Sequence, residues 1–206
     1  MQKIMFNDRY GLTQAVLNGT KTMTRRLIKD VNIIQALNEL ADIEIIKEKV
    51  ARYKRGEVVA VAQSYYDVYA ERQVNGSFYE WCKIHHLDHK KEIHDMEELQ
   101  KKNGEGWTNK MFVKPSLMPH QIQITGIKIE RLQDITDEDC LKEGVIQQAH
   151  PFVREAKDVY VCPNLEGYYT HPRGCFADLI NRPSVGRKGL WEENPWVICY
   201  SFKLVK

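Results

Sequence analysis

Near its start this 206-residue chain carries the stretch Gly19-Thr20-Lys21-Thr22-Met23-Thr24-Arg25-Arg26-Leu27-Ile28. Threonines and basic residues fill most of the stretch, and two apolar residues close it. A glycine followed by threonine-rich sequence and then by apolar residues is typical of a loop that leads into a strand. The stretch therefore predicts a strand near the start of the chain, entered through a polar loop.

The same stretch has the composition of a reactive site. The Thr24 hydroxyl is a poor nucleophile until a base removes its proton, and a desolvated, neutral Lys21 can be that base. Arg25 and Arg26 can bind a phosphate or a carbonyl edge. The alternative is an exposed polar strand, because runs of charge are usually solvated. Residues three apart point to opposite faces of a regular strand, so cooperation of Lys21 with Thr24 requires a bend between them.

Several segments have the apolar spacing of helices. Residues 12–16 carry an apolar stripe, which Asn7 or Asp8 can cap at the start and Gly19 can close at the end. Thr136 can cap another short helix, which is expected to end at Gly144. Two more regions are expected to be helical, at residues 31–54 and 174–182.

Three segments predict strands. Residues 58–62 are a continuous apolar run, and residues 196–204 alternate apolar and polar side chains. From Gln121 onward isoleucines also alternate with polar residues, but the phase of the alternation changes at Gly126. A glycine at a change of phase suggests a β-bulge or a barrel corner. Strands interrupted by short helices, without a βαβ rhythm, favour a small mixed barrel over a doubly wound sheet.

Composition narrows the class of protein. The net charge of +2 does not support a general nucleic-acid coat, which would need a strong basic excess, but leaves a local basic site open. Five cysteines without paired spacing fit a reducing cytosol. We find no signal peptide and no apolar run long enough for a membrane span, so a cytoplasmic protein with no membrane association is expected.

Four segments together resemble a known family. Residues 18–26 are similar to the signature that opens ASCH domains, which are relatives of the PUA RNA-binding fold. The other three resemble the longer bacterial and phage ASCH proteins and occur in the family's order. They lie at 114–119, 129–144 and 194–197, the last followed by a final strand. Residues 67–110 and 146–173 fall outside the resemblance.

The resemblance implies a fold of the α+β class. The expected architecture is one domain over residues 1–206, built as a PUA-like (ASCH) small mixed β-barrel of five to seven strands with short flanking helices. A variable, mostly helical insertion is expected at about 67–110, including a helix near residues 91–102, and should lie outside the barrel.

The resemblance also implies a reaction. ASCH proteins similar to this chain include amidohydrolases that act on N4-acetylcytidine and carry a lysine, a threonine three residues later and a distant glutamate. Lys21 and Thr24 match the first two positions, and Glu143, just before Gly144, matches the third. The implied mechanism has Lys21 activate Thr24 for attack on the acyl carbonyl while Glu143 acts as acid or base. Read alone, Glu143 would be a solvated residue at the end of a helix. The chain is about twice as long as those enzymes, so its extra segments can cover or reshape the pocket.

Several other residues are candidates for substrate binding beside Arg25 and Arg26. Trp196 begins the last expected strand, and Tyr65 follows the second. Aromatic rings at a barrel mouth can stack on a base, which contributes about 1–3 kcal/mol per base, or can simply pack in the core. Lys114 and Ser116 can bind a sugar or phosphate, or can hold a turn.

The insertion also contains side chains of the types that bind zinc. Cys82, His85 and His89 have helical spacing, and His94 follows. A structural zinc site needs four arranged ligands, and no second pair lies at a known spacing. We therefore expect no metal and no other cofactor.

Three functions remain open from the sequence. The first is hydrolysis of an amide on a modified nucleobase or nucleoside. The second is a non-catalytic PUA-like module that binds RNA or a nucleotide, and the third is a protein-interaction module. Lys21, Thr24 and Glu143 favour the first, whereas Arg25 and Arg26 suit the first two equally. Fold alone does not decide between them.

Overall fold

The computed structural model describes residues 1–39, 42–74, 106–150, 158–183 and 185–205, together with residues 83, 88, 90, 91, 94, 95 and 98. The chain divides into two compact units, and each is described by itself below. Unit 1 comprises Met1–Phe6, Val58–Ile122 and Val205–Lys206. Unit 2 comprises Asn7–Glu57 and Gln123–Leu204. The single domain expected from the sequence stays a prediction.

The fold is of the mixed α+β class. Five strands form a sheet of order β1-β3-β4-β7-β2, with bounds β1 Lys3–Ile4, β3 Val58–Val61, β4 Gln121–Arg131, β7 Trp196–Leu204 and β2 Met23–Leu27. β1 pairs with β3 in parallel and β2 with β7 antiparallel, so the sheet is mixed. A second, two-stranded antiparallel sheet joins β5, Ile146–Gln148, to β6, Val159–Val161.

The sequence predicts a closed or nearly closed barrel of five to seven strands; the described residues form a five-stranded mixed sheet that is not closed, because its strand order has two ends. Closure needs strands of matched length and stagger that leave no free edge. The strand at one end, β1, spans two residues and the strand at the other, β2, spans five. Gly126 nevertheless marks the predicted change of phase. Ile122 and Ile124 are buried before it and Ile129 is buried after it, within one continuous strand.

Unit 1 has its own small core. Its buried members are Ala60, Ala62, Tyr65, Val68, Val113 and Met118, with Trp107 and Leu117 packed against them. The unit also holds helix α4, Tyr65–Val74, and two 3-10 turns, η1 at Lys110–Phe112 and η2 at Pro115–Leu117. Helix α4 covers the start of the predicted insertion. Most of the rest of that insertion, with most of the helix expected near 91–102, lies outside the described residues.

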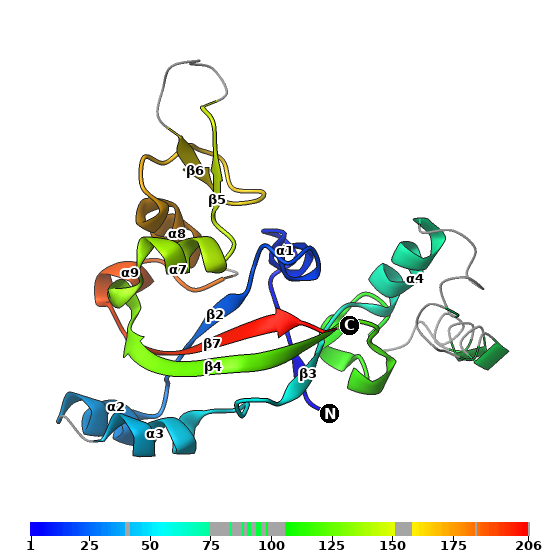
Figure 1. The fold of residues 1–206 in the computed structure, drawn as a ribbon, viewed down its shortest axis with the longest axis horizontal. Coiled ribbons are helices and arrows are strands. Elements are labelled where there is room, and N and C mark those ends of the chain that lie inside the picture. The colour runs from blue at the N-terminus through cyan, green and yellow to red at the C-terminus, as the bar shows by residue number, and fades with distance from the viewer. Residues whose placement is uncertain are drawn as a thin grey trace. The chain divides into compact units, whose positions relative to one another are not determined.

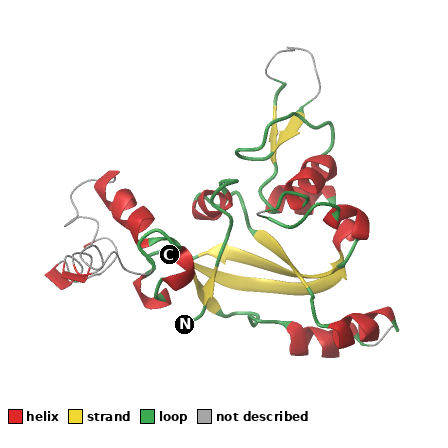
Figure 2. Cartoon of the chain, turned by 180° about the vertical axis from the view of Figure 1, so that it is seen from behind, coloured by secondary structure: helices red, strands yellow, loops and turns green. Residues whose placement is uncertain are grey.

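Unit 2 surrounds the strands β4, β7 and β2 with helices. Figures 1 and 2 show α7, α8 and α9 on one side of β4 and β7, and α2 and α3 on the other. Strand β7 is therefore covered on both faces, and the run from Val197 to Tyr200 is buried without alternation. The helices are α1 Leu12–Leu17, α2 Val31–Asn38, α3 Ile43–Val50, η3 Leu132–Asp134, α7 Asp137–Lys142, α8 Pro172–Ile180 and α9 Leu190–Glu193.

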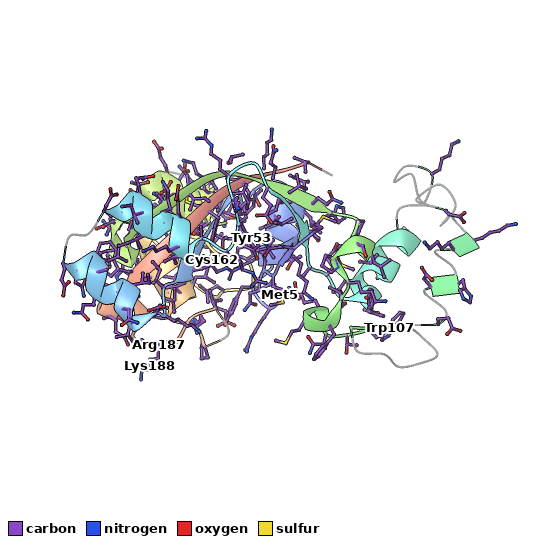
Figure 3. All side chains as sticks on the ribbon, turned by 90° about the horizontal axis from the view of Figure 1, so that it is seen from below. Met5, Tyr53, Trp107, Cys162, Arg187 and Lys188 are labelled. Carbon is purple, nitrogen blue, oxygen red and sulfur yellow. The ribbon has the colours of Figure 1, made fainter. Side chains whose placement is uncertain are left out.

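Side chains outside the strands complete unit 2. Tyr53 packs edge-on against Tyr200, with 5.2 Å between ring centroids (Figure 3). The Tyr200 hydroxyl also accepts a hydrogen bond from the backbone N–H of Arg52 at 2.9 Å. The segment after α3 is thereby fixed to strand β7. Arg187 and Lys188 lie at the periphery of the unit in the same view.

The first predicted helix forms, but its cap differs from the prediction. The N-cap of α1 is Gly11, which adopts a left-handed φ of 63°. Asn7 and Asp8 instead hold the turn before it, where the Asn7 carbonyl accepts from the Leu12 N–H and the Asp8 carboxylate accepts from the Thr13 hydroxyl. The region 31–54 contains two helices, capped by the Asp30 and Asp42 side chains.

Helix α7 begins and ends as the sequence predicts. The Thr136 side chain accepts a hydrogen bond from the Asp139 N–H, and Gly144 follows the helix with a φ of 103°. Replacing Thr136 with alanine should therefore lower the free energy of unfolding by about 1 kcal/mol, the usual loss for an N-cap. Urea unfolding of Thr136→Ala and Thr136→Ser measures this. The serine variant keeps the cap oxygen, so an equal loss in both would contradict the capping role.

Candidate active site

The loop between α1 and β2 turns at Gly19, two residues before Lys21. Gly19 has a left-handed φ of 79°, and the Lys21 N–H then donates to the Ala15 carbonyl at 2.8 Å. The next residue, Thr22, donates its N–H to the carbonyl of Lys142, the last residue of α7, at 2.8 Å. The backbone at Lys21 is thus fixed against both helices before the strand begins.

This placement brings Lys21 to Glu143. The Lys21 Nζ lies 2.6 Å from Glu143 Oε2 and donates a second hydrogen bond to the Glu143 backbone carbonyl at 2.7 Å. The side chains are 3% and 6% exposed. Glu143 is the C-cap residue of α7, so the helix end presents a carbonyl and a carboxylate to the same ammonium group. The two residues that the sequence places 122 positions apart form a buried ion pair.

Arg25 contacts the same carboxylate from β2. Its Nη1 donates to Glu143 Oε1 at 3.0 Å, while Lys21 holds Oε2. The rest of the guanidinium is held by two further acids. Nε and Nη2 donate to Glu130 Oε1 at 2.9 and 2.6 Å, and Nη2 also donates to Asp139 Oδ2 at 3.0 Å. The Arg25 side chain is 1% exposed.

The network ends toward solvent at Lys128. Its Nζ lies 2.9 Å from Glu130 Oε2 and 2.6 Å from Asp139 Oδ2, and its side chain is 44% exposed. We call Lys21, Arg25, Lys128, Glu130, Asp139 and Glu143 the charged network. It contains three basic and three acidic side chains, so its formal charge is balanced.

The surroundings shift the acid strengths within the charged network. Burial lowers the pKa of the Lys21 ammonium below its usual value, although Glu143 opposes the change. Burial would raise the pKa of Glu130 and Asp139, but Lys128 and Arg25 outweigh it and hold both values below the usual range. Glu130 and Asp139 therefore stay ionised at neutral pH, whereas Lys21 is closer to losing its proton than an exposed lysine.

Thr24 lies next to this network without joining it. It is buried, and it pairs with Tyr200 in the β2–β7 ladder while Arg25 pairs with Cys199. Successive residues of a strand face opposite sides, so Thr24 and Arg25 point away from each other. Within the described part of the chain, the Thr24 hydroxyl makes no hydrogen bond to Lys21 or Glu143. Arg26 is exposed and shares the Thr24 face.

The structure does not place Trp196 at this site. The Trp196 carbonyl pairs with the Ile28 N–H, whereas the N–H of Phe202 pairs with the Thr22 carbonyl. Six strand residues separate these ends of β7, which is about 20 Å at about 3.3 Å per residue. The Trp196 ring is also occupied. Its Nε1 donates to Asn38 at 2.8 Å, and the guanidinium of Arg131 lies 4.4 Å from its centroid.

The remaining predicted binding residues belong to unit 1. Tyr65 is a core residue whose hydroxyl accepts from the Lys114 backbone N–H at 2.9 Å, so its ring is not free to stack on a base. Lys114 and Ser116 are exposed and lie at the 3-10 turn η2, which Lys114 caps. These observations favour the turn-forming alternative for both residues.

Sequence reasoning missed half of the charged network. Two signals were present. Lys128 and Glu130 are two residues apart on a strand and therefore share a face, and Asp139 and Glu143 are four apart on a helix and therefore share a side. Both pairs were available in the sequence, but each is also typical of a solvated surface.

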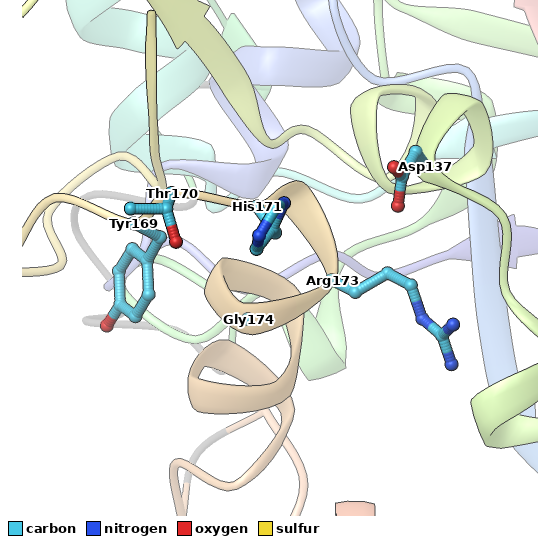
Figure 4. A pocket seen from close by; sticks show the side chains of 6 residues that line it. All are labelled: Asp137, Tyr169, Thr170, His171, Arg173 and Gly174. Carbon is cyan, nitrogen blue, oxygen red and sulfur yellow. The ribbon is translucent and has the colours of Figure 1, made fainter. Parts of the chain in front are cut away.

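Among the cavities of the described part of unit 2, two lie close to functional candidates or polar side chains. One of about 220 Å³ is lined by Arg25, Arg26 and Lys29 together with six apolar side chains, Leu27, Leu132, Ile180, Val185, Leu190 and Val197. The other, of about 490 Å³, is lined by Asp137, Tyr169, Thr170, His171, Arg173 and Gly174 (Figure 4). Only the smaller cavity includes a member of the charged network.

No group of three or more His, Cys, Asp or Glu side chains among the described residues could hold a metal ion. The cluster weighed for zinc, Cys82, His85 and His89, lies outside the described residues. None of the described helices combines the length and apolar character needed to span a bilayer.

The chain was compared with protein-family models, with curated proteins and with solved structures. None of the three comparisons gives a match.

Proposed function

We propose that this chain is a PUA-like ASCH protein that hydrolyses an amide on a modified nucleoside, with N4-acetylcytidine as the reference substrate. The observation that carries the proposal is the buried ion pair between Lys21 and Glu143. It unites the two residues that match the family's catalytic lysine and glutamate, and it does so beside the matching Thr24. Burial of both partners supports chemistry rather than a solvated surface contact.

A buried lysine and glutamate can exchange their proton. Low polarity disfavours separated charges, so the neutral amine with a protonated carboxyl becomes accessible. After the transfer, the Glu143 Oε2–H donates to the neutral Lys21 nitrogen, and one Lys21 N–H still donates to the Glu143 backbone carbonyl. The nitrogen lone pair can take a proton from a hydroxyl once this carboxyl O–H turns from Lys21 toward the leaving amine. One proton transfer would therefore prepare both a base, Lys21, and an acid, Glu143.

The reaction then follows in balanced steps. The Thr24 oxygen attacks the acyl carbonyl carbon while its proton passes to Lys21. The tetrahedral intermediate expels the cytosine amine, which receives its proton from Glu143, and an acyl ester remains on Thr24. Water attacks that ester while the Glu143 carboxylate takes its proton, the Thr24 oxygen leaves with the proton that Lys21 holds, and the free acid departs, which restores Lys21 and Glu143 to their starting forms. The Thr24 hydroxyl makes no hydrogen bond to Lys21 in the described residues and faces away from Arg25, so this mechanism requires the start of β2 to turn Thr24 toward Lys21 when substrate binds.

The smaller cavity supports a small substrate group. Pockets for drug-sized ligands usually measure about 300–1,000 Å³. The cavity that Arg25 lines measures about 220 Å³, which suits a single ring or an acyl group, although Lys21, Thr24 and Glu143 are not among its lining residues. Its apolar lining fits such a group, and Arg26 and Lys29, which also line it, fit a neighbouring phosphate.

The test is hydrolysis of N4-acetylcytidine, free and within a short RNA, by the purified chain. Thr24→Ala should abolish release of acetate, whereas Thr24→Ser should keep measurable turnover and accumulate an acetylated protein detectable by mass spectrometry. Binding without turnover by the unaltered chain would instead favour a non-catalytic nucleotide-binding module. If the unaltered chain shows no binding and no turnover, the protein-interaction alternative remains.

A further inference from the structure

Arg25 holds more of the charged network than any other side chain. Its three nitrogens contact acids from two elements. Glu130 lies on β4, Asp139 lies on α7, and Glu143 is the C-cap residue of α7. All three contacts are buried or nearly so. A planar guanidinium fixed at several points cannot rotate without breaking charge-assisted hydrogen bonds, each about twice as strong as a neutral one. Arg25 is therefore a rigid reference point beside Glu143.

We propose that Arg25 is a positioning residue of this site, which holds Glu143 Oε1 so that Oε2 is presented to Lys21. Glu130 and Asp139 in turn hold Arg25. The inference rests on the proposed function, because it assigns Arg25 a role in the same reaction. This role differs from the one that the sequence suggests for Arg25, which is substrate binding. The guanidinium has no exposed donor left for a ligand, which is why a binding role does not fit.

The arrangement also affects the charge on Lys21. Glu143 divides its two oxygens between two cations, so neither cation receives the full stabilisation of the carboxylate. A positive neighbour also disfavours a second positive charge. The charged and titratable groups near this pair come from three strands and one helix. They are Arg25 on β2, with Arg26 acting from the other face of that strand, Lys128 and Glu130 on β4, Asp139 and Cys140 on α7, and Cys199 on β7.

The first test replaces Arg25 with glutamine, which removes the charge. The pKa of Lys21 should then rise by about one unit, the size expected for one nearby charge. NMR of the lysine ε-carbons measures it without substrate, with Lys21→Met identifying the signal. Because the reaction needs neutral Lys21, the rising limb of the pH–rate profile should move to higher pH by the same amount.

The second test replaces Arg25 with lysine. Lysine keeps the positive charge but lacks the planar guanidinium that donates to several acids at once. This variant guards against failure of Arg25→Gln to fold. The value of kcat should fall about 10–100-fold, as for a misplaced catalytic group, with KM and the pH profile nearly unchanged. A purely structural role predicts that both variants lose activity only in proportion to the fraction unfolded.

Lys128→Gln is the matched control. Lys128 contacts Glu130 and Asp139 but not Glu143, so its loss should leave the Lys21 pKa in place. An unchanged Lys21 pKa in Arg25→Gln, or normal kcat in Arg25→Lys, would overturn the positioning role. The NMR titration needs no turnover. A shifted Lys21 signal in a chain that hydrolyses nothing would therefore separate failure of the proposed reaction from failure of this inference.

Discussion

Replacing Lys21 with methionine should reduce kcat/KM for N4-acetylcytidine by about 10²–10⁴-fold, the usual contribution of one positioned proton transfer. Methionine keeps most of the apolar stem of lysine but cannot accept a proton. The Glu143 carboxylate would still be held through its other oxygen by Arg25. The loss should therefore appear in turnover rather than in folding. Steady-state release of acetate, followed beside circular dichroism of the same samples, measures both.

Lys142→Met is the matched control for this experiment. Lys142 precedes Glu143 in the chain, but its side chain is 48% exposed and lies 3.5 Å from Asp139. Its removal should change turnover by less than about twofold, because exposed ion pairs contribute about 0–1 kcal/mol to stability. Wild-type turnover in Lys21→Met would show that another group is the base. A similar loss in both lysine variants would show a general effect of charge near the helix end.

Replacing Glu143 with glutamine should lower the free energy of unfolding by about 3–5 kcal/mol at pH 7, the cost of removing one partner of a buried pair. The substitution leaves the Lys21 ammonium buried with no carboxylate beside it. Urea unfolding gives the value directly. Glu138→Gln, an exposed position on the same helix, should change the free energy by less than about 0.5 kcal/mol.

The pH dependence of the Glu143→Gln variant has a definite sign. Glu143 raises the pKa of Lys21, so its loss leaves the folded-state value even further below the ordinary 10.5. Between those two pKa values the unfolded chain binds one proton more than the folded chain. Stability must therefore rise with pH across that window. If the free energy of unfolding of Glu143→Gln stays below that of the unaltered chain by the same amount from pH 7 to pH 10, Lys21 is not buried as described.

Local sequence signals predicted the elements that carry the site. The glycine before Lys21, the Thr136 cap and the glycine after Glu143 each act within one or two turns of chain. Their effect depends on backbone sterics and short-range hydrogen bonds, which are readable from sequence. The meeting of Lys21 with Glu143 was different in kind. It came only from a resemblance to a family, because no local rule joins residues so far apart.

The failures of prediction have a common physical cause. Trp196 and Tyr65 were assigned by residue type, yet each ring is occupied by neighbours from remote segments, Asn38 for one and the turn at Lys114 for the other. Barrel closure likewise depends on the lengths and stagger of distant strands. Tertiary partners decide whether an aromatic or a charge is free, and a single sequence does not identify them.

The pairing of β2 with β7 has a consequence for synthesis of the protein. The register joins Met23 to Ser201, so the strand beside the charged network pairs with one near the far end of this sequence. At about 5–20 residues per second, translation separates these partners by about 10–35 s. Strand β2 is made first, the acids of β4 and α7 follow, and β7 is made last. Contacts of such long range slow folding, so a ribosome-bound chain shortened before residue 196 should be unable to assemble this site.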